Sequence, residues 1–159
     1  MTRRVLRRMA FHLVFQMPFH TGLDVESLAR LKADYYDSLA EGVDDEPGFL
    51  DFTPPKGTHA EYINRVVWGV FESRAELDGV ISNFLRDWSI ERIGKVDLAV
   101  MRLAIYEMLR EKDVPLGVAV DEAVEIAKEY GTKESPSFIN GVLGNVSGEI
   151  KAKGREFIG

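Results

Sequence analysis

Several residue types and patterns are missing from this chain of 159 residues. It contains no cysteine, so a disulfide framework, a thiolate nucleophile and a thiolate metal site are excluded. The histidines, His12, His20 and His59, do not have the i, i+4 spacing of a helical zinc site, and their default roles are helix-face and cap residues. No apolar run approaches the ~20 residues that a membrane span needs, and the N-terminus lacks the pattern of a secretory signal. These absences favour a cytoplasmic protein that has no metal site and does not enter a membrane.

Signals for enzyme chemistry are equally sparse. No glycine-rich turn follows a predicted strand, so the two common nucleotide-binding fingerprints are missing. Asp44 and Asp45 form an acidic pair in a polar loop, where solvation is the simplest role. Asp121 and Glu122 form a second pair in the first turn of a predicted helix, where negative charge suits the helix dipole. We therefore expect a binding protein that is not an enzyme and has no cofactor.

Apolar residues recur at helical spacing nearly throughout the chain, and no segment alternates like a strand over a useful length. Predicted helices cover the opening segment, residues 24–41, a stretch from Thr58 that divides near Ser73, residues 95–111, residues 119–130 and a last segment with Ser135 as N-cap. The clear break is residues 43–57, where acids, glycines and three prolines predict a loop. We expect an all-α fold of about seven helices, with an N-terminal subdomain of residues 1–57 and a C-terminal helical bundle of residues 58–159.

Positive charge is concentrated at the N-terminus of an otherwise acidic chain. The net charge is -6, yet the first 23 residues carry four arginines and no acid. On a helical wheel at ~100° per residue, the apolar side of this segment consists of Leu6, Met9, Ala10, Leu13 and Met17. The opposite side carries Arg3, Arg4, Arg7 and Arg8 and continues along the helix with Phe11 and Phe15.

Three interpretations apply to this helix. Guanidinium groups match phosphate oxygens and aromatic rings stack on bases, so the face is typical of a site for single-stranded RNA. An amphipathic helix also often carries a few arginines as a solvated face, which is the simpler interpretation of this helix taken alone. A helix on a membrane surface is disfavoured, because Pro18 ends the helix early and the polar face is short.

A carboxylate ends an apolar row in the predicted helix of residues 95–111. The row consists of Val96, Val100, Leu103 and Glu107. A buried carboxylate that has no partner is costly. We therefore expect Glu107 to reach solvent, an internal arginine such as Arg102 or Arg110, or a binding partner.

Three segments of the C-terminal half carry a family resemblance. In order along the chain they are RIGKVDLAVMRLAIYEML, DVPLGVAVDEAVEIAKEYG and SPSFINGVLGNV, and together they span residues 92–146. They closely resemble the NusB family of bacterial transcription antitermination factors, and the opening RRVLRRMAFHLVF is similar to that family's arginine-rich first helix. The chain departs from the family pattern at His12, Phe15, Asp121 and Gly144, and its loop of residues 43–57 is longer than the pattern requires.

The resemblance implies an all-α fold with two small subdomains and a function in RNA binding without catalysis. It implies that the protein binds the single-stranded boxA element of nascent RNA together with the ribosomal protein NusE. In that complex it would help RNA polymerase to read through terminators, notably in ribosomal RNA operons. Arg3, Arg4, Arg7 and Arg8 would then contact RNA, and Glu107 would lie at the contact with NusE. We expect Phe15 to stack on a base or to support the arginines, with Phe11 beside it.

Three alternatives stay open. Some relatives form dimers that cover the RNA-binding face, so the row that ends in Glu107 could instead serve a homodimer. A related RNA-binding module precedes the catalytic domain of some ribosomal RNA cytosine methyltransferases, but a chain that ends at Gly159 without cysteine is not expected to be that enzyme. The last alternative is a helical protein-interaction module whose arginines are only solvated.

Overall fold

The structure, a computed structural model, describes residues 1–17, 24–43, 46–47, 52–86 and 89–156. Seven α-helices lie in these ranges and confirm the predicted all-α class. His20, Asp44 and Asp45, which the sequence singles out, lie outside the described residues. The chain forms two compact units, residues 1–68 and 69–159. The division falls inside the third helix and not after residue 57, because a loop marks where helices end and not which helices share a core.

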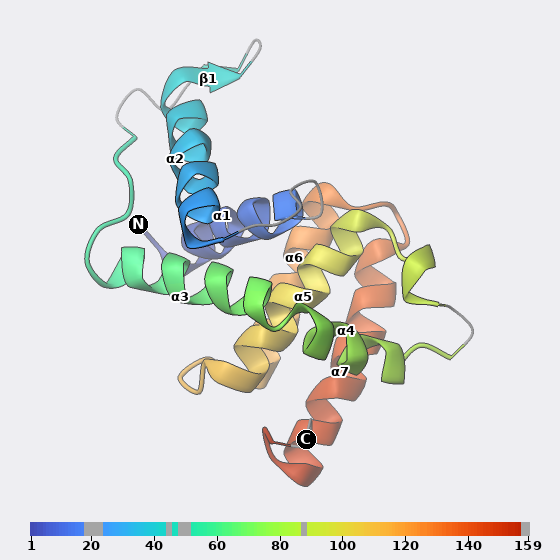
Figure 1. Ribbon diagram of the computed structural model, residues 1–159. Coiled ribbons are helices and arrows are strands. Elements are labelled where there is room, and N and C mark those ends of the chain that lie inside the picture. Colours follow the sequence, from blue (N-terminus) through green and yellow to red (C-terminus); the bar gives the residue numbers. More distant parts are fainter. Residues whose placement is uncertain (18–23, 44–45, 48–51, 87–88, 157–159) are drawn as a thin grey trace. The chain divides into compact units, whose positions relative to one another are not determined.

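Unit 1, residues 1–68, contains α1 (Arg3–Gln16), α2 (Val25–Glu41) and most of α3 (Thr58–Glu72). In Figure 1, α2 rises away from α1 and ends at a short hairpin. The hairpin pairs β1 (Gly42–Val43) with β2 (Glu46–Pro47) in antiparallel register. The predicted loop of residues 43–57 therefore begins within β1 and contains β2. Each strand has two residues, which is too short to produce an alternating pattern in the sequence.

Polar caps fix where α1 and α2 begin. The hydroxyl of Thr2 accepts a hydrogen bond from the backbone N–H of Val5 at 3.2 Å. The carboxylate of Asp24 accepts a hydrogen bond from the backbone N–H of Ser27 at 2.7 Å. These bonds satisfy amide groups that the first turn of a helix leaves without an intrahelical partner.

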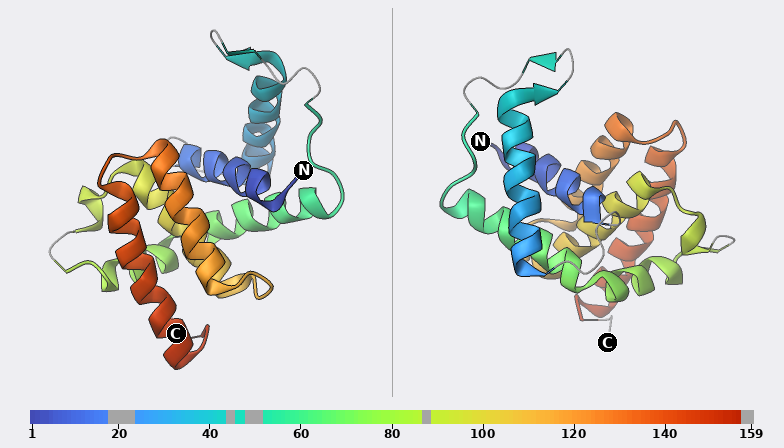
Figure 2. Two further views of the ribbon diagram at one scale, coloured as in Figure 1. Left: turned by 180° about the vertical axis from the view of Figure 1, so that it is seen from behind. Right: turned by 45° about the horizontal axis from the view of Figure 1, so that its top comes forward.

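Unit 2, residues 69–159, contains α4 (Arg74–Asn83), the 3-10 turn η2 (Ile90–Arg92), α5 (Lys95–Arg110), α6 (Leu116–Tyr130) and α7 (Ser135–Lys153). As its largely apolar sequence suggests, α5 is strongly buried, with ten buried residues between Ala99 and Leu109. α6 packs against both α5 and α7, and Figure 2 shows α6 and α7 side by side. Within the described ranges, no helix combines the length and the apolar character that crossing a bilayer requires.

Charged pairs and one close approach join the helices of unit 2. Arg102 donates two hydrogen bonds of 2.7 Å to the carboxylate of Asp78 on α4. A Cβ atom at Gly69 would lie only 2.3 Å from the ring of Tyr106, so glycine is what allows this ring to approach α3. The start of α7 corrects a prediction: Glu134 is the N-cap, whereas Ser135 is the first helical residue and its buried hydroxyl accepts a hydrogen bond from the N–H of Thr132.

Candidate nucleic-acid interface

Arg4, Arg8 and Phe15 form an accessible strip along α1, which we call the α1 face. Arg4 is exposed, and Arg8 and Phe15 are half-buried. At ~100° per residue, the three side chains leave the helix within about 40° of one another. Because α1 contains four arginines and no acid, this strip is positively charged. An anionic ligand that lies along the helix can therefore meet two guanidinium groups and one ring.

Arg3 begins α1 and lies over an aromatic ring of unit 1. Its guanidinium carbon is 4.2 Å from the centre of the Tyr62 ring on α3. Arg3 is exposed, whereas Tyr62 is 1% exposed. A guanidinium held over a ring loses part of its conformational freedom before any ligand binds. Arg3 is thus a restrained cation at the surface of unit 1.

The structure corrects the predicted placement of Arg7 and Phe11. The helical wheel puts both on the accessible side, but Arg7 is 5% exposed and Phe11 is 2% exposed. The wheel assumes that α1 buries one stripe, whereas the helix also buries Val14 and therefore a wider arc of its circumference. Every buried side-chain nitrogen and oxygen atom of the described residues has a hydrogen-bond partner, and Arg7 is among the residues that interact within the protein. Arg7 and Phe11 support the α1 face from the interior.

Aromatic contacts connect Phe15 to α2. The ring centre of Phe11 lies 6.1 Å from that of Phe15 and 5.6 Å from that of His12. His12 Nδ1 and the hydroxyl oxygen of Tyr35 on α2 are 2.6 Å apart, which is a hydrogen-bond distance. The sequence gives no signal for this bond, because it joins residues on different helices and follows no spacing rule. The bond connects α1 to α2.

The row of rings continues along unit 1. The ring centres of Tyr35 and Tyr36 are 5.8 Å apart, and those of Tyr36 and Phe52 are 5.9 Å apart. Burial raises the pKa of Tyr36 to about 12, above the ordinary value of 10.0 at which a tyrosine is already neutral at physiological pH. The rings of Tyr35, Tyr36 and Phe52 thus extend the aromatic packing of unit 1.

The structure places Glu107 inside the protein, where 1% of it is exposed. Arg102 and Arg110, the internal arginines that the sequence suggests for it, pair with Asp78 and Glu76 of α4. Glu107 interacts within the protein, and no buried polar side-chain atom of the described residues lacks a hydrogen-bond partner. A partner cannot reach this carboxylate while the fold is intact, so the predicted contact with NusE is corrected to a structural role.

Metal chemistry receives no support from the described part of the chain. No group of three or more histidine, aspartate and glutamate side chains gathers there as a metal site requires. The Nδ1 atom of His12 is already at hydrogen-bond distance from the Tyr35 hydroxyl.

The described residues define a small all-α protein with an arginine-rich first helix. The NusB family model matches residues 4–148 of the chain. The transcription antitermination protein NusB of Clostridium botulinum (strain Loch Maree / Type A3) is 38% identical over 146 residues, which cover 92% of this chain and 99% of that protein. The chain belongs to the NusB family.

Two solved structures have a similar fold. The structure of T. maritima NusB matches with a TM-score of 0.75 and 34% identity, over 94% of this chain and 92% of that chain. A crystal structure of the antitermination factors NusB and NusE in complex with dsRNA matches with a TM-score of 0.71 and 21% identity, over 92% of this chain and 96% of the matched chain. Because the sequence identity to this second structure is only 21%, the match shows a similar fold and nothing more.

Proposed function

We propose that this NusB-family protein is an antitermination factor that binds boxA single-stranded RNA together with NusE. In the bacterial cytoplasm it would join the antitermination complex of RNA polymerase and promote read-through, notably in ribosomal RNA operons. The observation that carries the proposal is the α1 face, where two arginines and an aromatic ring lie accessible on a NusB fold. The name of the relatives, transcription antitermination protein, supports the same role.

Each residue of this face has a chemical role in the proposal. Arg3, Arg4 and Arg8 bind phosphates, because the planar guanidinium presents paired donors at the spacing of phosphate oxygens. Phe15 stacks on a base, an interaction of about 1–3 kcal/mol that tolerates any base. Arg7 and Phe11 keep α1 in place and do not touch RNA. The protein acts by binding alone, without catalysis or a cofactor.

NusE is the protein partner in this proposal. A solved NusB–NusE–dsRNA structure of the same fold supports it, although its 21% identity does not transfer contact residues to this chain. Glu107 is not a candidate for the contact, since it is buried. We propose that NusE and RNA bind together and that each raises the affinity for the other, as linkage requires of coupled ligands.

Fluorescence anisotropy with a labelled boxA RNA tests the proposal. We expect the protein to bind boxA RNA more tightly than an RNA of the same composition in scrambled order. Addition of NusE should tighten boxA binding further, whereas the scrambled RNA should gain little. Equal binding of the two RNAs, unchanged by NusE, would contradict the proposed function. Sedimentation over the same range of protein concentrations, with and without RNA, shows whether a homodimer forms and whether it competes with RNA.

A further inference from the structure

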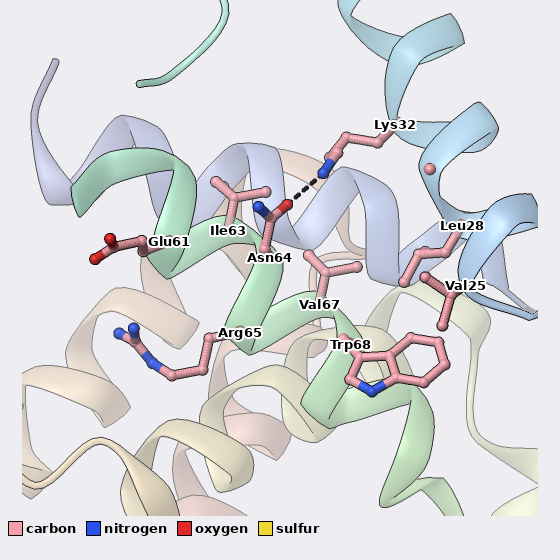
Figure 3. Close-up of a pocket in the computed structure, with 10 residues that line it drawn as sticks. Val25, Leu28, Lys32, Glu61, Ile63, Asn64, Arg65, Val67 and Trp68 are labelled. Carbon is pink, nitrogen blue, oxygen red and sulfur yellow. Dashed lines mark hydrogen bonds between the residues drawn. The ribbon is translucent and has the colours of Figure 1, made fainter. Parts of the chain in front are cut away.

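A groove in unit 1 lies between α2 and α3, and we call it the α2/α3 groove. Its volume is about 660 Å³. Figure 3 shows the side chains of Val25, Leu28 and Trp68 together at one end of the groove, with Glu61 and Arg65 at the other end. No residue of the α1 face lines it. The groove is therefore a second surface, and the proposed RNA site leaves it unused.

The helix that forms one wall of this groove is little buried. Of the 17 residues of α2, all of whose exposures are described, Leu31 is the one that falls in the buried class. Val25 is 66% exposed although it is apolar, and Leu28 is half-buried. A helix of this length is marginal in water and depends on packing of its apolar face. An external surface laid along the groove would supply packing that α2 lacks.

The side chain of Lys32 favours a negatively charged group in the α2/α3 groove. It is half-buried, and burial lowers its pKa. Within the described residues its partner is the side-chain oxygen of Asn64, which is neutral, and Figure 3 shows the bond across the groove. An ammonium group that has lost water without gaining a carboxylate is destabilising. An arriving carboxylate would compensate for that loss.

The surrounding charges favour an acidic protein segment over RNA. Six of the ten residues that line the groove are apolar, and its charged lining residues are Lys32, Arg65 and Glu61. A run of phosphates would lose water against the apolar lining without a partner for each charge. The rest of α2, with four acids and two basic residues outside or inside the lining, adds repulsion against such a run. A helix that places one carboxylate at Lys32 among apolar side chains avoids most of that repulsion.

We propose that the α2/α3 groove docks an amphipathic helix of a partner protein that carries an acidic residue. Its apolar side chains, repeating at i, i+3 and i+4, pack against Val25, Leu28 and Trp68, and its carboxylate pairs with Lys32. This surface is distinct from the α1 face and does not depend on the proposed RNA binding. It gives the protein a docking position for a helix in addition to its proposed RNA site.

The fluorescence of Trp68 reports directly on this groove, once Trp88, the second tryptophan of the sequence, is replaced by phenylalanine. The probe is a designed helical peptide with leucines at i, i+3, i+4 and i+7 and one glutamate beside them. A twin peptide carries a lysine in place of the glutamate. We expect the acidic peptide to give saturable binding and the lysine twin to bind about tenfold more weakly or worse, which corresponds to about 1.4 kcal/mol.

A charge reversal with a matched control separates the local contact from general charge. Lys32→Glu should weaken the acidic peptide about tenfold and strengthen its lysine twin. Arg30→Glu makes the same change two residues away on a side chain that does not line the groove, and it should change the affinity less than about twofold. Lys32→Met, which keeps an apolar side chain, should lose the preference for the acidic peptide and melt at a higher temperature than wild type.

Three results would overturn the proposal. The first is an equal loss of peptide affinity in Lys32→Glu and Arg30→Glu, which would show that the loss comes from the change in net charge and not from a contact with Lys32. The second is the absence of saturable binding by the acidic peptide. The third is a Trp68 response to a short RNA and not to the peptide, which would assign the groove to nucleic acid. Binding of boxA RNA by the same variants is measured separately, so failure of this proposal is distinguishable from failure of the proposed function.

Discussion

Arg4 and Arg7 lie about one turn apart on α1, and their surroundings differ sharply. Arg4 is exposed, whereas Arg7 is 5% exposed. We predict that Arg4→Ala lowers RNA affinity and changes the free energy of unfolding by less than about 0.5 kcal/mol, as surface substitutions usually do. Arg7→Ala should lower that free energy by about 1–3 kcal/mol, because it removes a buried guanidinium that interacts within the protein. Denaturant unfolding and RNA titration of both variants measure the two effects, and equal stabilities would contradict the assignment.

Phe11 and Phe15 are in ring contact, yet they differ in exposure. Phe11 is 2% exposed and Phe15 is half-buried. We predict that Phe11→Ala costs about 3–5 kcal/mol of stability, as a core phenylalanine does. Phe15→Ala should cost less stability and instead weaken RNA binding by about 1–3 kcal/mol. Phe15→Leu is the control, since it keeps most of the apolar volume but removes the stacking ring. If Phe15→Ala unfolds as readily as Phe11→Ala while binding RNA normally, Phe15 belongs to the core.

The start of α2 depends on one charged cap, and this makes the helix sensitive to acid. The hydrogen bond from the backbone N–H of Ser27 lowers the pKa of Asp24 from its ordinary 3.8. Because the folded state favours the charged carboxylate, its contribution is complete above pH 3.8 and is lost as the pH falls through the lowered pKa. We predict that Asp24→Asn, which keeps an acceptor but not the charge, removes this pH dependence. Melting followed by circular dichroism between neutral and strongly acidic pH measures it, and identical profiles of the two proteins would refute the cap's role.

Helix positions could be predicted because their signals are local. Periodicity gives α2 as residues 24–41, and the helix is Val25–Glu41. The division near Ser73 is also confirmed, since α3 ends at Glu72 and α4 begins at Arg74. The hairpin after α2 could not be predicted, because each of its strands has two residues. A pattern needs several repeats before it differs from chance.

Burial at the candidate site was less predictable than the helix that carries it. The helical wheel correctly places Arg4, Arg8 and Phe15 on the accessible side of α1. It does not show how much of the helix circumference other elements cover. The wheel misplaces Arg7 for this reason, because charged residues become buried only where distant parts of the chain satisfy them. Glu107 ends an apolar row, so the sequence leaves its burial open, and only the resemblance implies a contact with NusE. The bond between His12 and Tyr35 also joins distant parts of the chain, so no local sequence pattern predicts it.

Charge is distributed unevenly over the protein as a whole. A net charge of -6 coexists with a first helix that has four arginines and no acid. The negative charge elsewhere disfavours general association with nucleic acid, and under the proposed function the positive helix would be where an RNA strand binds. RNA affinity should therefore depend on a few arginines and not on the sum of all basic residues.

The dependence of RNA affinity on salt tests this claim most directly. The logarithm of RNA affinity falls linearly with the logarithm of salt concentration. For single strands, each phosphate contact adds about 0.7 to the steepness of that slope. We predict that the double variant Arg4→Ala/Arg8→Ala loses affinity for boxA RNA and reduces the slope by about 1.4, for two lost contacts. Lys133→Ala/Lys151→Ala removes the same charge from exposed positions of unit 2 and should leave the slope unchanged. An unchanged slope in the folded arginine variant, or an equal reduction in the lysine variant, would contradict the assignment of the α1 face.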